Sequence, residues 1–302
     1  MANVKGRAID KTHLSIDMAE DRGIIHRDYI AHCLRWSHVV KHLYKNNRYK
    51  TATILDVGCG KEIPLMKLLY SNKLIPLWYI GVDVNKLSLP EMLDRDRLDD
   101  VIKLYGKTDF AEKVKLNDRG FLSIDTDICF EEDPGYNLYP APTVVTCFEV
   151  LEHVEPEHTV RILKKIREVM RNDSYAFIST PCYNGSAAAN HVNEITYEAL
   201  GTLIQELGFG IEGVYGTFAS QRDVEPAIKE SFFNTIYQAL KSYYDSNVLS
   251  NIFAPIYPEY SRNCLWVLTA DPKEEQDWNV FPKWEELKQP WTSSKLWKEL
   301  KP

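Results

Sequence analysis

The 302-residue sequence lacks long apolar runs, internal repeats and paired cysteines. No stretch approaches the roughly 18 consecutive apolar residues that a membrane span requires, and the first residues have no apolar core typical of a signal peptide. The six cysteines are scattered without a CxxC pair, so we expect free thiols in a reducing compartment. These absences predict a cytoplasmic protein with no membrane partner.

The sequence also has fewer basic than acidic residues. The sequence has 36 Lys and Arg against 43 Asp and Glu, a net charge of −7. A protein that binds duplex DNA with its whole surface is usually basic, so strong duplex binding is not expected. The composition is otherwise ordinary, with 44% apolar and 12% aromatic residues, and the length suffices for one large core with extensions.

Short apolar stretches alternate with amphipathic ones from residue 51 onward. The predicted strands are 53–57, 77–84, 120–124, 142–148, 175–179, 210–215 and 263–269, and the predicted helices are 63–74, 159–170 and 197–207. This alternation predicts an α/β protein with a Rossmann-like, doubly wound, mostly parallel sheet of seven strands. Right-handed crossovers would place the loops after the parallel strands at one edge, where ligands collect.

The rest of the chain forms extensions of this core. Residues 1–50 are predicted to be a helical N-terminal extension, because apolar residues recur at three-to-four spacing within them. Residues 51–270 form the main domain, and residues 271–302 are a tryptophan-rich tail that packs on its own domain or stacks on a partner.

Two segments interrupt the alternation within the main domain. Residues 86–119 carry a charged run that we interpret as a solvated helix face. Residues 224–260 form an aromatic-rich insertion before the last strand. It is either a lid packed on the sheet edge or a wall for a planar substrate.

A glycine turn follows the first predicted strand, in the sequence Asp-Val-Gly-Cys-Gly from Asp56 to Gly60. Gly58 and Gly60 permit a sharp turn and the close approach of a ligand to the main chain. The dinucleotide fingerprint G-x-G-x-x-G fails because Ile63 replaces its third glycine, and the P-loop pattern fails as well. The remaining D-x-G-x-G pattern resembles motif I of the class I S-adenosylmethionine (SAM) methyltransferases. A purely structural turn is the alternative.

Acidic residues follow the next two predicted strands. Asp83 ends the second strand, where a carboxylate can accept both hydroxyls of a ribose. The resemblance assigns it to the SAM ribose. After the predicted third strand, Asp125 or Asp127 would accept from the adenine amino group, unless they only cap a turn. The resemblance thus implies a cofactor site made of Asp56, Gly58, Cys59, Gly60, Asp83, Val84, Asp125, Asp127, Phe148 and Glu149.

The most informative segment follows the fourth predicted strand and reads Glu-Val-Leu-Glu-His-Val from Glu149. It resembles the E-V-L-E-H-V signature of ubiquinone-type O-methyltransferases and of small-RNA 3′-terminal 2′-O-methyltransferases. The D/N-P-P-Y/F motif of amino-methylating DNA enzymes is not at this position. The Pro-Cys nucleophile of cytosine-5 enzymes is also missing here. The spacing places Glu149, Glu152 and His153 on one face of a helix start.

A second segment, from His191 to Thr196, is similar to the H-x-x-E-aromatic-T segment that supplies a metal ligand in the RNA 2′-O-methyltransferases, with Ile195 in place of the aromatic residue. Such a mixed oxygen and nitrogen set suits Mg, Mn, Fe or Zn. The resemblance therefore implies a metal held by Glu149, Glu152, His153 and His191. Two alternatives remain: a metal-free enzyme with His153 as general base, or acids that only favour a helix N-terminus.

Together these motifs predict a SAM-dependent methyltransferase that acts on a hydroxyl group of a small molecule, nucleotide or nucleic acid. We expect Glu149, His153 and His191 to be its catalytic residues. Methyl transfer is an in-line displacement that needs a positioned nucleophile. His153 would deprotonate the hydroxyl, or a metal would lower its pKa. The alternatives are N-methylation of a nucleobase or small amine, and a non-catalytic SAM-binding or scaffold protein.

Overall fold

The computed structural model describes residues 27–60, 63–83, 102–105, 141–185 and 187–272. The strands are β1 (Thr53–Val57), β2 (Trp78–Val82), β3 (Ile102–Tyr105), β4 (Val144–Phe148), β5 (Tyr175–Pro181), β6 (Gly210–Phe218) and β7 (Asn263–Thr269). The α-helices are α2 (Arg27–Tyr44), α3 (Pro64–Ser71), α5 (Pro156–Val169), α6 (Tyr197–Glu206), α7 (Gln221–Lys229), α8 (Asn234–Leu240) and α9 (Ser246–Phe253). Four 3₁₀ helices complete the described elements: η3 (Lys45–Thr51), η4 (Leu151–His153), η5 (Ala254–Ile256) and η6 (Pro258–Tyr260).

The described strands form one seven-stranded sheet in the order β3-β2-β1-β4-β5-β7-β6. β1 pairs in parallel with β2 and β4, β2 with β3, and β4 with β5, whereas β7 runs antiparallel between β5 and β6. The predicted doubly wound, mostly parallel α/β sheet is therefore confirmed. As predicted, the carboxyl ends of β1, β2, β4 and β5 share one edge.

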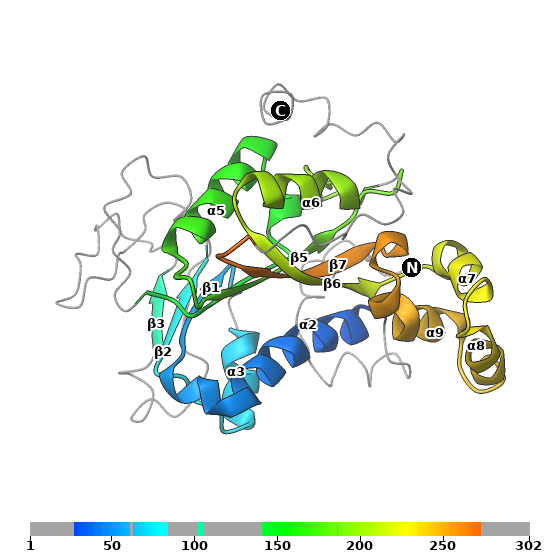
Figure 1. Ribbon diagram of the computed structural model, residues 1–302, viewed down its shortest axis with the longest axis horizontal. Coiled ribbons are helices and arrows are strands. Elements are labelled where there is room, and N and C mark those ends of the chain that lie inside the picture. Colours follow the sequence, from blue (N-terminus) through cyan, green and yellow to red (C-terminus); the bar gives the residue numbers. More distant parts are fainter. Residues whose placement is uncertain (1–26, 61–62, 84–101, 106–140, 186, 273–302) are drawn as a thin grey trace, which may run out of the picture.

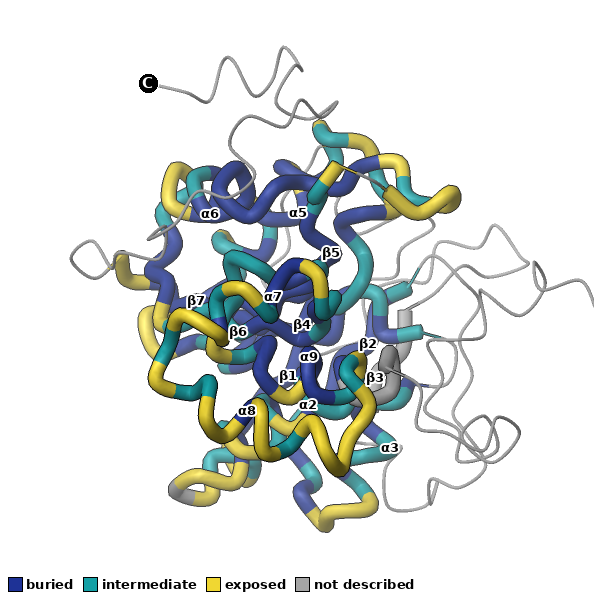
Figure 2. Tube along the Cα trace, turned by 90° about the vertical axis from the view of Figure 1, so that its right-hand side faces the viewer, coloured by how far each residue is buried: buried dark blue, intermediate teal, exposed yellow. Residues whose placement is uncertain are grey.

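Helices cover both faces of this sheet (Figure 1). Apolar side chains are buried on each face. α5 and α6 lie on one face over the first core cluster, where Leu163 and Leu203 are fully buried. α2 and α3 lie on the other face, where Val39 and Leu69 are fully buried. β1 and β7 are buried along their whole length (Figure 2), as expected for strands with helices on both sides.

The third strand corrects the sequence prediction. The strand that pairs with β2 is β3, within the 86–119 segment, where the sequence pattern predicts no strand. The charged run of that segment, residues 94–100, lies outside the described residues. Four residues beside a charged run are too few to reveal a period, so only the register with β2 identifies the strand. The predicted strand 120–124 lies outside the described residues.

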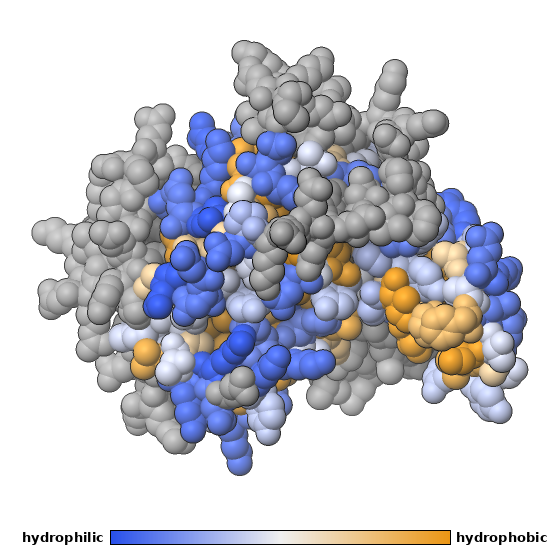
Figure 3. All heavy atoms as spheres, in the orientation of Figure 1, coloured by the Kyte–Doolittle hydropathy of each residue, from blue (hydrophilic) through white to orange (hydrophobic). Residues whose placement is uncertain are grey.

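The insertion before β7 folds as α7, α8, α9, η5 and η6 around a third, smaller core cluster. Phe233 and Tyr237 pack in or against this cluster, whereas Phe232 and Ile236 are exposed. Exposed apolar side chains gather there, at the right of Figure 3, where Figure 1 places α8 and α9. The tryptophan-rich tail from residue 273 lies outside the described residues. Among the described helices, none combines the length and apolar character that a bilayer crossing needs.

Candidate functional site

The glycine turn links the carboxyl ends of β1 and β2. Gly58 and Gly60 have positive φ angles of 70° and 71°, which a residue with a side chain rarely adopts. The backbone N–H groups of Gly58 and Cys59 both donate to the carbonyl of Val82, at 2.8 and 3.0 Å. Val150 packs directly on Gly58, leaving no room there for a β-carbon. The turn is therefore held from β2 on one side and from the loop after β4 on the other.

Asp56 lies beneath this turn rather than on it. The side chain is buried and accepts hydrogen bonds from the hydroxyl of Tyr79 and, at 2.6 Å, from that of Thr146. Burial raises the pKa of Asp56 to about 6, although both hydroxyl donors oppose the shift. Asp56 therefore joins β1 to β2 and β4, and its role toward the cofactor stays a prediction.

Asp83 lies beside the turn, one strand over, where the sequence prediction places a ribose acceptor. It is half-buried, and Oδ2 accepts from the backbone N–H of Gly60 at 2.9 Å. Among the described residues, a β-carbon at Gly60 would have only Pro64 within 4 Å, so these residues leave space beside the main chain there. This open turn with an adjacent carboxylate fits the methionine and ribose parts of SAM. Val84, Asp125 and Asp127 lie outside the described residues.

Glu149 follows β4 in the left-handed region, with φ 56°. Its Oε1 lies 2.5 Å from Nη1 of Arg35 on α2. It also accepts from the hydroxyl of Ser179 at 2.9 Å, and the amide of Asn263 reaches both carboxylate oxygens at 2.9 and 3.0 Å. Sequence reasoning missed these three partners, because each comes from a different element far along the chain. Phe148, just before Glu149, packs against the core under α2 and α3.

Glu152 and His153 lie on the short 3₁₀ turn η4, not on the predicted α-helix start. α5 begins only at Pro156, because a proline holds the residue before it, Glu155, in an extended conformation and favours the first helical position. Glu152 is buried and accepts from the hydroxyl of Thr180 at 3.2 Å. The 3₁₀ turn places Nε2 of His153 3.7 Å from Oε1 of Glu152.

The loop after β5 brings His191 to the same place. The backbone N–H groups of Val192 and Asn193 donate to the carbonyl of Glu152, at 2.9 and 3.2 Å. The rings of His153 and His191 then meet edge to face, with centroids 5.0 Å apart. Ligand atoms of Glu152, His153 and His191 all lie within 4.8 Å of one another. The structure thus unites three of the four predicted metal ligands.

A buried carboxylate orients His191. Nδ1 of His191 lies 2.6 Å from Oε1 of Glu194. The other carboxylate oxygen of Glu194 lies 3.4 Å from Nη2 of Arg262. A carboxylate that accepts from Nδ1 leaves Nε2 of the same ring free to act as a ligand. The cluster therefore offers one carboxylate and two imidazoles, a donor set that fits a divalent transition metal. The place of Glu149 as fourth ligand stays a prediction, since Arg35, Ser179 and Asn263 hold its carboxylate.

Burial shifts both titrating groups of η4 toward their neutral forms. The pKa of Glu152 is raised well above its ordinary value by burial and by the negative charge of Glu149. The pKa of His153 is lowered, mainly by burial. A neutral imidazole at pH 7 can either accept a proton or bind a metal.

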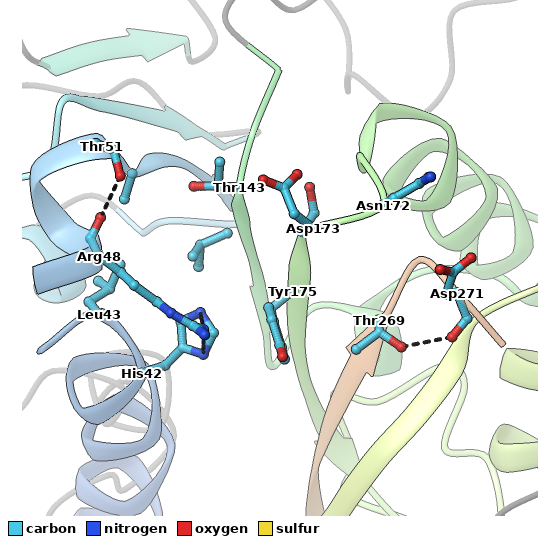
Figure 4. Close-up of a pocket in the computed structure, with 13 residues that line it drawn as sticks. His42, Leu43, Arg48, Thr51, Thr143, Asn172, Asp173, Tyr175, Thr269 and Asp271 are labelled. Atoms are coloured by element: carbon cyan, nitrogen blue, oxygen red, sulfur yellow. Dashed lines mark hydrogen bonds between the residues drawn. The ribbon is translucent and has the colours of Figure 1, made fainter. Parts of the chain in front are cut away.

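A cavity of about 440 Å³ lies elsewhere, at the amino ends of β4 and β5. Figure 4 shows His42 and Arg48 on one side of it and Thr143, Asp173 and Tyr175 opposite them. Because the glycine turn and the histidine cluster lie at the carboxyl ends of the strands, this cavity is not part of their site.

Solved structures similar to this chain are distant in sequence. A 1,6-didemethyltoxoflavin N1-methyltransferase from Burkholderia thailandensis, bound to its substrate and S-adenosylhomocysteine, is 12% identical, with 90% of this chain and 92% of that chain covered at a TM-score of 0.47. A magnesium protoporphyrin IX methyltransferase from Synechocystis PCC 6803 is 11% identical, with coverages of 80% and 85% and a TM-score of 0.44. A SAM-dependent methyltransferase from Archaeoglobus fulgidus is 16% identical, with coverages of 78% and 94% and a TM-score of 0.39.

No curated protein matches the sequence. A family model described as a methyltransferase domain matches residues 27–212, more than half of the chain. That range contains the glycine turn, Asp83, and the segments of Glu149 and His191. The chain therefore belongs to the methyltransferase-domain family.

Proposed function

We propose that this enzyme transfers the methyl group of SAM to a hydroxyl oxygen, with a divalent metal held by Glu152, His153 and His191. The observation that carries the proposal is the cluster of these three side chains, whose ligand atoms lie within 4.8 Å of one another. Amine methylation needs no such set of donors.

The two parts of the site have separate tasks. The turn of Gly58 and Gly60 would hold the methionine part of SAM, and Asp83 its ribose. Bound SAM supplies an electrophilic methyl group, and a bound divalent ion supplies a Lewis acid that lowers the pKa of a hydroxyl. The chain contributes position, because in-line displacement depends on the approach of the acceptor oxygen.

His153 is the group most suited to remove the acceptor's proton when no metal is bound. Its side chain is 43% exposed, its pKa is lowered by burial, and its Nδ1 lies 3.3 Å from the carbonyl of Asn190. An Nδ1–H donated to that carbonyl leaves Nε2 as the proton acceptor. The acceptor molecule belongs among hydroxyl-bearing small molecules, nucleotides and single-stranded nucleic acid, since the net charge of −7 disfavours duplex DNA.

Metal content and cofactor affinity test the two parts independently. The purified protein is loaded with Mn²⁺ or Zn²⁺, freed of excess metal, and analysed for bound ions by mass spectrometry, while calorimetry measures S-adenosylhomocysteine binding. We expect one ion per chain in the wild type and none in His191→Ala. The control His38→Ala removes an imidazole that packs on Tyr215 and should keep the ion. An equal metal content in all three proteins would remove the metal from the proposal.

A further inference from the structure

Arg35 is a buried cation that forms an ion pair with Glu149. Only 2% of its side chain is exposed, and Nη1 lies 2.5 Å from Oε1 of Glu149. The same Nη1 donates to the hydroxyl of Ser179 at 3.3 Å. Arg35 belongs to α2, so this ion pair joins the helix that precedes the sheet to the carboxyl end of β4.

The backbone of Glu149 is held in the left-handed region, which is unfavourable for a residue with a side chain. Such a strained conformation persists only where its surroundings hold it. Arg35, Ser179 and Asn263 provide that restraint, because all three contact the Glu149 carboxylate. The direction in which the chain leaves β4 is thus set by these side-chain contacts.

Val150, the next residue, connects the restrained Glu149 to the glycine turn. Val150 packs on Gly58 so closely that a β-carbon on the glycine would overlap it. On its other side, the Gly58 N–H donates to the carbonyl of Val82 at 2.8 Å. The turn therefore lies between a hydrogen bond from β2 and the side chain that follows Glu149.

We propose that Arg35 is a positioning residue for cofactor binding: through Glu149 and Val150 it sets the shape of the Gly58 turn. The inference rests on the proposed function, in which this turn holds SAM. It makes α2 a part of the cofactor site even though Arg35 need not touch the cofactor.

The packing of α2 on the sheet and α3 does not require the ion pair between Arg35 and Glu149. The helix already buries Trp36, Val39 and Leu43 against α3 and the sheet. A buried ion pair is often no more stabilising than apolar residues of the same size, because both charges lose their hydration. The pair is better explained by the defined geometry that it imposes on the chain after β4.

Calorimetric binding of S-adenosylhomocysteine tests the proposal in the full-length protein. We expect Arg35→Gln to weaken binding about tenfold or more, and Arg35→Lys, which keeps one charged donor, to recover most of the loss. The matched control is Arg48→Gln, which makes the same change beside the cavity at the opposite edge of the sheet. It should bind as the wild type does.

The double variant Arg35→Gln/Glu149→Gln separates positioning from stability. Removing both charges leaves neither buried without a partner, so the melting temperature should return toward that of the wild type. Affinity should nevertheless stay about tenfold weaker, because the short charged contact is gone. Affinity that recovers together with the melting temperature would overturn the proposal, as would wild-type affinity in Arg35→Gln. If the wild type itself bound no S-adenosylhomocysteine, the proposed function would fall first.

Discussion

The side chain of Val150 lies against Gly58, so that a β-carbon at that glycine would overlap Val150 Cγ2. At Gly60, two residues later, the same addition would meet, within the part of the chain that the structure describes, only Pro64, at 3.9 Å. Both glycines have nearly the same positive φ. An alanine at either position would therefore meet the same backbone strain, and the two positions differ in the space available for its β-carbon.

Gly58→Ala should consequently damage the site far more than Gly60→Ala. Both changes place alanine in the left-handed region, at a cost of about 1 kcal/mol. Only Gly58→Ala must also displace Val150. We expect the melting temperature to fall in both variants, and to fall further in Gly58→Ala.

Shortening Val150 tests this explanation directly. Gly58→Ala/Val150→Ala removes the overlapping methyl group and should recover part of the lost melting temperature. No recovery in the double variant would mean that backbone strain, and not the contact with Val150, makes Gly58 necessary.

Asp83→Ala should weaken S-adenosylhomocysteine binding by about 1.5–3 kcal/mol, the usual scale for hydrogen bonds to a charged group. The carboxylate would lose the ribose hydroxyls, and the Gly60 N–H would lose its acceptor at 2.9 Å. Asp173→Ala, at the cavity on the opposite edge, is the control and should bind normally. NAD should give no heat with any of these proteins, because the third glycine of the dinucleotide fingerprint is replaced by Ile63.

Chelation separates the two roles that His153 can have. If His153 and His191 bind a metal, excess EDTA should abolish methyl transfer without changing cofactor affinity, and His191→Ala should reproduce its effect. If His153 is only a general base, His153→Ala should cost roughly 10²–10⁴-fold in rate while EDTA has no effect. The measurement is conversion of SAM to S-adenosylhomocysteine with a hydroxyl acceptor. Full activity in EDTA together with an inactive His153→Ala would refute the metal.

His42 should make the fold less stable in acid. Burial, followed by the charges of Arg48 and Lys45, lowers its pKa from 6.5 to about 4. Between pH 6.5 and 4 the unfolded chain therefore binds a proton that the folded chain does not, and stability falls as the pH falls through this range. Asp56, whose pKa is raised to about 6, contributes with the opposite sign over part of the same range.

Comparing the wild type with His42→Phe isolates the contribution of His42 to the pH dependence of stability, because Asp56 is common to both proteins. Phenylalanine keeps an aromatic ring against Tyr175 and Phe177, which His42 contacts at centroid distances of 4.3 and 5.4 Å. Melting temperatures measured from pH 7 to 4 should fall less in the variant than in the wild type. Parallel curves would contradict the lowered pKa of His42.

Local sequence determined the features that depend on neighbouring residues. The glycine turn after β1, the acid after β2 and the last strand, 263–269, were all placed correctly, because a turn, a strand end and a buried apolar run each leave a pattern within a few residues. The spacing of Glu152 and His153 from Glu149 was likewise visible in the sequence. Their 3₁₀ conformation was not, since Pro156 delays the helix that their spacing suggested.

Only the tertiary structure decided which distant side chains meet. Arg35, Ser179 and Asn263 converge on Glu149 from α2, β5 and β7, and Asn263 lies 114 residues beyond Glu149 in the sequence. The strand beside β2 was also identified only by its pairing. Periodicity reports how one element divides its residues between core and solvent, but the partner of a side chain depends on how the elements pack. The sequence therefore predicted a methyltransferase, whereas the contacts of Arg35 on α2 and Asn263 on β7 with Glu149 determined how the chain after β4 is held.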